Sequence, residues 1–122
     1  MACFLVPTAA ALVATAVGRQ VKDAPPKAGR VSWRKKLSWL LNLLWGGAIL
    51  LALEHVWHGE VIFAPPFLTA MGDPENTAVM LRELGTVGVG MAVIVVLAWV
   101  GMVLVADRVA AVRGVVEVKV ER

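Results

Sequence analysis

The chain has 122 residues, of which 59% are hydrophobic and 17% are charged. Soluble domains use about 45–50% apolar and about 25% charged residues, so one core of this size does not hide so much apolar surface from water. The net charge is +3, and the basic residues flank apolar segments, which is typical of membrane orientation and argues against nucleic-acid binding. The one cysteine, Cys3, excludes a disulfide within the chain and a cysteine-based metal cluster.

Residues 2–18 form the first apolar segment and carry no charge. This length is close to the lower limit, about 17 residues, for a helix that spans a bilayer. A secretory signal peptide and a surface-lying helix are the alternatives, because Ala14, Thr15 and Ala16 resemble a cleavage site. The positively charged leader of a signal peptide is missing, however. We therefore expect a first transmembrane helix over residues 2–18.

Residues 19–36 differ sharply from this segment, because they hold seven Lys and Arg side chains against one acid, Asp23. Two prolines and a glycine interrupt any helix here. The sequence predicts a solvated cytoplasmic loop. The alternative is a docking patch for anionic lipid or an acidic partner, carried by the basic run just before the next apolar segment. That run consists of Arg34, Lys35 and Lys36.

Residues 37–58 predict a second transmembrane helix. The 18 steps from Trp39 to Trp57 span about 27 Å as a helix, close to the thickness of a bilayer's hydrocarbon core, and Trp favours both interfaces. Gly46 and Gly47 give a smooth patch on which another helix packs closely.

Residues 59–76 predict an external connection, because prolines, Gly72 and Asp73 punctuate the segment. The connection also carries many apolar side chains. This composition favours a segment that lies in the membrane interface or packs against another subunit.

Residues 77–106 predict a third transmembrane helix, with Asn76 or Thr77 as its cap. The 23 residues from Leu84 to Ala106 carry no charge and are long enough to span a bilayer with some tilt. Gly85 and Gly88 offer further surfaces for helix packing. The helix is expected to continue past this run and to end at Gly114.

Residues 107–122 form the tail, in which the pattern changes. Valines at 116, 118 and 120 alternate with charged residues, a period of two that is typical of a β-strand. One strand is not stable alone. The tail is therefore expected either to be disordered or to add a strand, through Val116–Val120, to the sheet of a cytoplasmic partner.

Orientation follows from the basic residues. In a chain with three spans, the loop and the tail lie on one side and hold eleven of the twelve Lys and Arg residues, and Arg82 is the exception. The opposite side holds the acids Glu60, Asp73, Glu75 and Glu83, with Glu54 just inside the membrane. The positive-inside rule therefore predicts an outside N-terminus and a cytoplasmic C-terminus, most simply in a prokaryotic cytoplasmic membrane.

One group of side chains could take part in binding or proton transfer. It consists of Glu54, His55, His58 and Glu60, at the end of the second helix. Histidine can ligate a metal, shuttle a proton or bind a quinone carbonyl, and a carboxylate just inside the interface is costly and often functional. The structural interpretation is that these groups only pair with each other at the headgroup level. The metal motif HExxH is absent, and both histidines lie at one end of one helix, which disfavours a haem held by two histidines of one chain.

The sequence thus predicts an all-α integral membrane protein with three transmembrane helices and a short strand-like cytoplasmic tail. We expect a small accessory or anchoring subunit of a larger membrane complex, or a homo-oligomer, without catalytic activity of its own and without a required cofactor. The alternative is a subunit of a respiratory-type complex that handles protons, a quinone or a metal through Glu54, His55 and His58. A second alternative is a self-assembling channel or transporter, although a charged residue near the midplane is missing.

Overall fold

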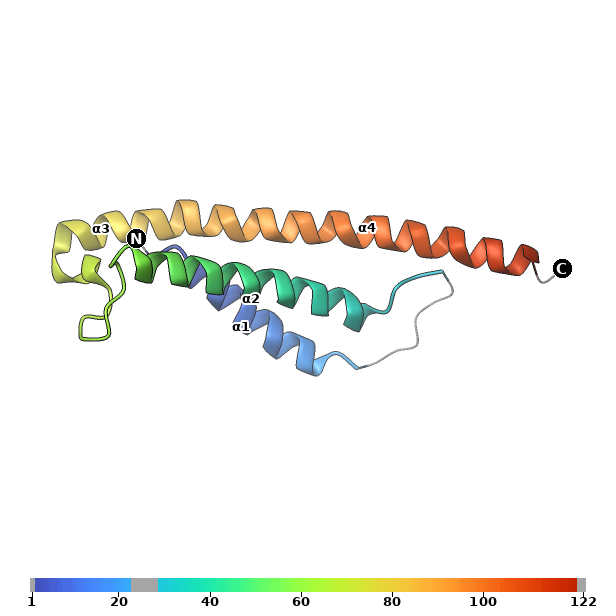
Figure 1. The fold of residues 1–122 in the computed structure, drawn as a ribbon, viewed down its shortest axis with the longest axis horizontal. Coiled ribbons are helices and arrows are strands. Elements are labelled where there is room, and N and C mark those ends of the chain that lie inside the picture. The colour runs from blue at the N-terminus through green and yellow to red at the C-terminus, as the bar shows by residue number, and fades with distance from the viewer. Residues whose placement is uncertain (1, 23–28, 121–122) are drawn as a thin grey trace.

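The computed structural model describes residues 2–22 and 29–120, and every regular element among them is helical. In chain order these are α1 (Leu5–Gln20), α2 (Trp33–Trp57), the short 3₁₀ turn η1 (Thr69–Gly72), α3 (Pro74–Glu83), the π-helical segment η2 (Leu84–Gly88) and α4 (Val89–Val120). The prediction of an all-helical chain is confirmed for these residues. Figure 1 shows α4 as a long rod with α2 running along it and α1 crossing α2 obliquely.

α1 and α2 form an antiparallel pair. The start of α1 meets the end of α2, where the rings of Phe4 and His55 lie 5.3 Å apart edge to face. Further along, the indole Nε1 of Trp45 donates a hydrogen bond of 3.2 Å to the hydroxyl of Thr15. Thr15 in turn donates to the carbonyl of Ala11 at 2.7 Å, so the polar groups that face each other between the two helices are paired.

Two stretches of the chain are helical, long and apolar enough to cross a membrane. One is α2, whose 25 residues span about 37 Å. The other is the continuous rod that α3, η2 and α4 form, of which the 42 residues Pro74–Val115 qualify. The prediction of three spanning helices is therefore supported for two. α1 has 16 residues and a length of about 24 Å, which falls short of a bilayer core of about 30 Å.

The rod begins at a different cap from the predicted one. Asp73, and neither Asn76 nor Thr77, is the cap residue, and its carboxylate accepts a hydrogen bond of 3.2 Å from the backbone N–H of Asn76. Pro74 follows at the first helical position, where its missing N–H costs nothing and its fixed φ suits the helix. Asp-Pro was interpreted as loop punctuation, although the same dipeptide is a helix start signal.

The predicted strand in the tail is wrong. α4 continues through Gly114 and on to Val120, while residues 121–122 lie outside the described part. A helix that already exists gains one hydrogen bond for each residue it adds, without the cost of a new nucleus. A lone strand has no ladder partner, so the alternation of valines and charges does not decide the outcome. The projecting end of the rod, from Asp107 to Val120, is about 20 Å long.

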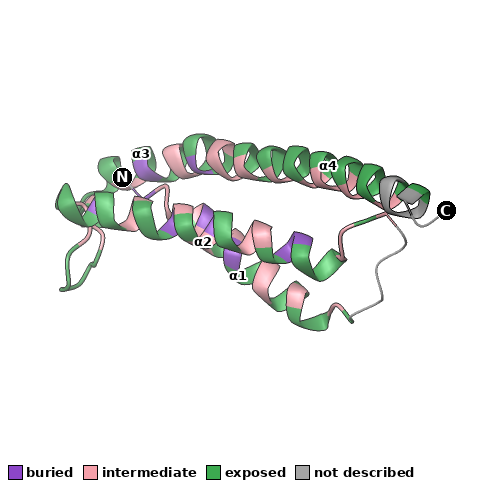
Figure 2. Cartoon of the chain, turned by 45° about the vertical axis from the view of Figure 1, so that its right-hand side comes forward, coloured by how far each residue is buried: buried purple, intermediate pink, exposed green. Residues whose placement is uncertain are grey.

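The chain buries few side chains, as Figure 2 shows. Its most apolar stretch lies in the rod, and no residue of that stretch is buried. The hydrophobic residues that are buried lie mostly where α1 and α2 meet each other and the rod: Ala2, Ala11, Leu37, Leu44, Ala48 and Met80. Two long apolar helices that remain uncovered suggest a location in a membrane.

Candidate functional site

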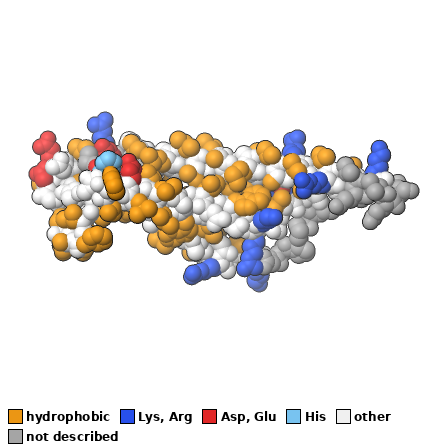
Figure 3. Space-filling view, in the orientation of Figure 1, with side chains coloured by type: hydrophobic (Ala, Val, Ile, Leu, Met, Phe, Trp, Pro, Cys, Tyr) orange, Lys and Arg blue, Asp and Glu red, His pale blue; other side chains and the backbone are white. Residues whose placement is uncertain are grey.

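The two ends of the molecule differ in charge. Figure 3 shows the acidic side chains and a histidine at one end and most of the Lys and Arg side chains over the other half. The acidic end holds the predicted site, which we call the histidine cluster and define as Glu54, His55, His58 and Glu60. The structure separates this cluster into a buried half and an exposed half.

His55 is the centre of the buried half, with 4% of its surface exposed. Its Nδ1 lies 2.7 Å from the carbonyl oxygen of Leu51, one turn back in α2. A carbonyl only accepts, so in the neutral ring Nδ1 carries the proton and Nε2 holds the lone pair. The thiol of Cys3 lies 3.3 Å from Nε2 and donates to it. His55 therefore connects the start of α1 to the end of α2.

Glu60 reaches His55 because of the turn that ends α2. Gly59 adopts a φ of 70°, in the left-handed region that suits a residue without Cβ. Its N–H donates a hydrogen bond of 3.0 Å to the carbonyl of Val56. The N–H of Glu60 donates one of 2.9 Å to the carbonyl of His55. These two bonds form a Schellman motif, which turns the chain back over the helix end. The carboxylate of Glu60 then lies 3.6 Å from Nε2 of His55.

Glu54 and His58 form the exposed half. Their side chains are 58% and 62% exposed, and the closest carboxylate oxygen lies 3.9 Å from Nε2 of His58. They share a helix face at i, i+4 spacing, as the sequence predicts. Water or lipid headgroups screen such a pair, so it adds little to stability.

The metal alternative receives no support from the geometry of the described residues. No group of three or more His, Cys, Asp or Glu side chains is placed there to hold a metal ion. Both nitrogens of neutral His55 already face partners, the carbonyl of Leu51 and the thiol of Cys3. What the arrangement provides is a buried imidazole next to a thiol, with a carboxylate nearby.

A second polar group, which sequence reasoning missed, lies at the opposite end of α2. Lys36 and Asp107 form an ion pair with Nζ and Oδ2 2.7 Å apart, and their side chains are 7% and 22% exposed. The other carboxylate oxygen accepts from the N–H of Val31 at 3.1 Å, and the indole N–H of Trp99 donates to the carbonyl of Lys36 at 2.7 Å. We call these four residues the basic-end clamp, because they join the start of α2 to α4.

A signal for this clamp was present in the sequence. Lys36 comes directly before one apolar run and Asp107 directly after another, and antiparallel helices bring those two positions together. The clamp also removes one residue from the predicted docking patch of Arg34, Lys35 and Lys36. Arg34 and Lys35 are exposed, whereas Lys36 points into the contact with α4 and binds Asp107.

The predicted packing glycines fall into two groups. Gly88 is buried against α1, and a Cβ at this position would lie 2.9 Å from Cγ2 of Val6. At Gly46, Gly47 and Gly85 an added Cβ would meet nothing within 4 Å. Gly88 thus serves packing inside the chain, and the other three face outward.

No protein-family model matches the sequence, and neither a curated protein nor a solved structure matches it.

Proposed function

We propose that this chain is a small integral-membrane subunit that acts as an accessory or anchor in a larger membrane complex. The observation that carries the proposal is the uncovered apolar surface of its two membrane-length helices. A chain of this size with so few buried side chains gains its stability from lipid and from neighbouring helices.

The chain has exposed surfaces on which neighbouring helices could pack. Gly46 and Gly47 on α2 and Gly90 on α4 have open space where a Cβ would be, so another backbone can approach closely. Close approach with good van der Waals contact is the main source of helix association in lipid. The end of α2 and the loop after it add a second surface, because Trp57 is 88% and Phe63 is 94% exposed. Side chains of this size seek either the membrane interface or a partner.

The proposed arrangement in the membrane has three spans, with α1 as the short one beside α2. The N-terminus lies outside and the C-terminus lies in the cytoplasm of a prokaryotic cell. Two observations support this orientation. Basic side chains gather over one half of the molecule in Figure 3, and the clamp joins α2 to α4 on that same half. Arg82 is the one basic residue that the positive-inside rule does not explain.

If the chain belongs to a complex, replacing the outward-facing glycines by larger residues should disrupt assembly and leave membrane insertion intact. In native membranes dissolved in mild detergent, the wild-type chain should migrate with other proteins in an assembly much heavier than 13.0 kDa. Replacing Gly46 and Gly47 by leucine should shift the chain toward lower mass, because the added side chains hold a neighbouring helix away.

The matched control is Ala98→Leu, which adds volume at an exposed position on the other long helix, α4. Ala98→Leu should leave the assembly unchanged. An assembly that contains copies of this chain alone would favour the self-assembling alternative. A monomeric wild-type chain in native membrane would contradict the proposal.

The proposed topology predicts which positions a membrane-impermeant thiol reagent reaches from outside intact cells. With Cys3 replaced by serine, a cysteine at Asp73 should be labelled, and cysteines at Arg30 or Lys119 should be labelled only after the cells are opened. All three positions are exposed on the molecule, so burial within the chain does not decide the result. Labelling of Asp73 and Lys119 from the same side would show that the rod does not cross the membrane and would contradict the proposed topology.

A further inference from the structure

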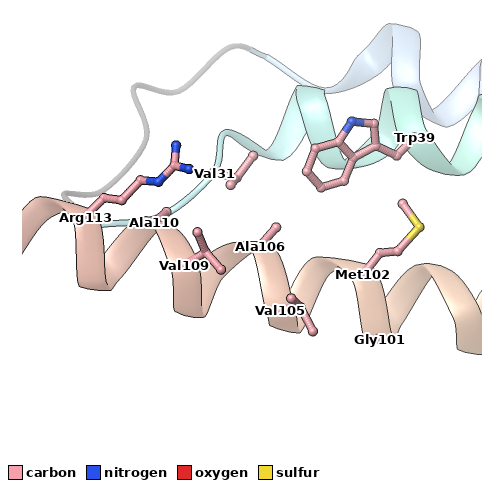
Figure 4. A pocket seen from close by; sticks show the side chains of 9 residues that line it. All are labelled: Val31, Trp39, Gly101, Met102, Val105, Ala106, Val109, Ala110 and Arg113. Atoms are coloured by element: carbon pink, nitrogen blue, oxygen red, sulfur yellow. The ribbon is translucent and has the colours of Figure 1, made fainter.

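A groove runs between the start of α2 and the projecting half of α4. Its volume is about 590 Å³, which lies within the usual range of roughly 300–1,000 Å³ for small-molecule sites. Figure 4 shows Val31 and Trp39 on one side and residues of α4, including Met102 and Val109, on the other. The groove is open along its length, so a long, flexible ligand can enter it from the side.

The groove has one charged end. Of the residues that line it, eight are apolar or glycine and one, Arg113, is charged. Figure 4 shows the guanidinium group of Arg113 extending back toward Val31, over the end of the apolar surface. The lining on α4 runs from Gly101 to Arg113, which is about 18 Å along the helix axis. Of this length, the part from Gly101 to Ala106, about 8 Å, belongs to the uncharged run, and the rest lies beyond it.

The direction of the groove matches that of a lipid. Its apolar part begins at Gly101, inside the uncharged run of α4, and its charged end lies two turns beyond the residue where that run stops, Asp107. A lipid of the leaflet at this end presents its acyl chain and headgroup in the same order. Two exposed basic residues, Arg30 and Lys35, are next in sequence to Val31 of the groove and Lys36 of the clamp, and they favour a negative headgroup.

The nearby acid does not oppose a negative headgroup. Asp107 accepts from Lys36 at 2.7 Å, so its charge is compensated within the basic-end clamp. Among the side chains that the structure describes here, the excess of charge that remains is positive. Arg113 presents a planar group with several donors, and a phosphate oxygen is a good acceptor for it.

We propose that the groove binds one anionic phospholipid of the surrounding bilayer, with an acyl chain along Trp39, Met102 and Val109 and the phosphate at Arg113. The proposal rests on the proposed membrane location, but it does not depend on any partner protein. It gives the chain a lipid-binding site with defined ends, in place of a diffuse attraction between a basic loop and a charged surface.

The test is retention of lipid by the purified full-length chain, measured by native mass spectrometry after release from micelles that contain equal amounts of phosphatidylglycerol and phosphatidylcholine. The wild-type chain should retain one phosphatidylglycerol in preference to phosphatidylcholine. Arg113→Gln should reduce that retention about fivefold, the effect of one cation near an anionic lipid surface. Arg108→Gln is the matched control, because it removes the same charge outside the groove and should change retention little.

A second pair of variants tests the groove itself. Ala106→Leu fills it and should reduce retention, whereas Ala98→Leu adds the same volume outside it and should not. Equal retention of both lipids, or equal losses in Arg113→Gln and Arg108→Gln, would overturn the proposal. A dimer that Ala106→Leu abolishes, with no effect on lipid, would assign the groove to a second copy instead. Extraction of cell membranes with carbonate distinguishes a failure of the lipid proposal from a failure of the proposed membrane location. A chain that is not inserted in the membrane would be released by carbonate in the wild type and in every variant.

Discussion

Replacing Gly88 by valine should separate α1 from the long rod and lower the free energy of unfolding by about 1–3 kcal/mol, the usual cost of overpacking. A Cβ at this position lies 2.9 Å from Cγ2 of Val6 and 3.3 Å from the carbonyl oxygen of Cys3. Neither neighbour yields easily, because valine is stiff at χ1 in a helix and the second atom belongs to the backbone. The helices must therefore move apart.

Unfolding of the purified chain in detergent, followed by tryptophan fluorescence, measures this loss. The control is Gly85→Val in the same π-helical segment, where an added Cβ meets nothing within 4 Å. This control should change stability much less. The two variants also differ in a second measurement, since displacing α1 carries Cys3 away from His55. A thiol reagent should then label Cys3 faster in Gly88→Val alone, and equal rates in both variants would contradict the packing argument.

The sequence predicted the helices well where hydrophobicity and interface residues agree. The run from Trp39 to Trp57 lies within α2, and the uncharged run from Leu84 to Ala106 lies within the rod. Both depend on local composition, which needs no knowledge of distant contacts. The prediction of a strand in the tail was wrong for a related reason. Its period-two pattern is local too, but the helix that precedes it supplies hydrogen-bonding continuity that a short window does not contain.

Only the exposed half of the histidine cluster could be predicted from the sequence. The spacing of Glu54 and His58 predicted their shared face, because that geometry belongs to one helix. The burial of His55 depends on Cys3, which is 52 residues away along the chain. Such a contact follows only from the antiparallel arrangement of α1 and α2. The same holds for the basic-end clamp, whose ion pair joins residues 71 positions apart.

That clamp leads to an asymmetric prediction, because its two charged partners differ in burial. Lys36 is 7% exposed and Asp107 is 22% exposed. Asp107→Asn preserves the shape but leaves a buried ammonium group without a compensating charge. Lys36→Met leaves a carboxylate that water reaches more easily and that still accepts from the N–H of Val31. Asp107→Asn should therefore destabilise the chain more than Lys36→Met does.

The double variant decides whether charge pairing is the cause. With Lys36→Met and Asp107→Asn together, no unpaired charge remains, and the chain should be more stable than with Asp107→Asn alone. Stability is compared in the same detergent for the wild type, both single variants and the double variant, which form a thermodynamic cycle. Losses that simply add would show that the two residues act independently. In that case the hydrogen bond from Trp99 to the carbonyl of Lys36, which every one of these variants retains, would be the contact that holds α2 against α4.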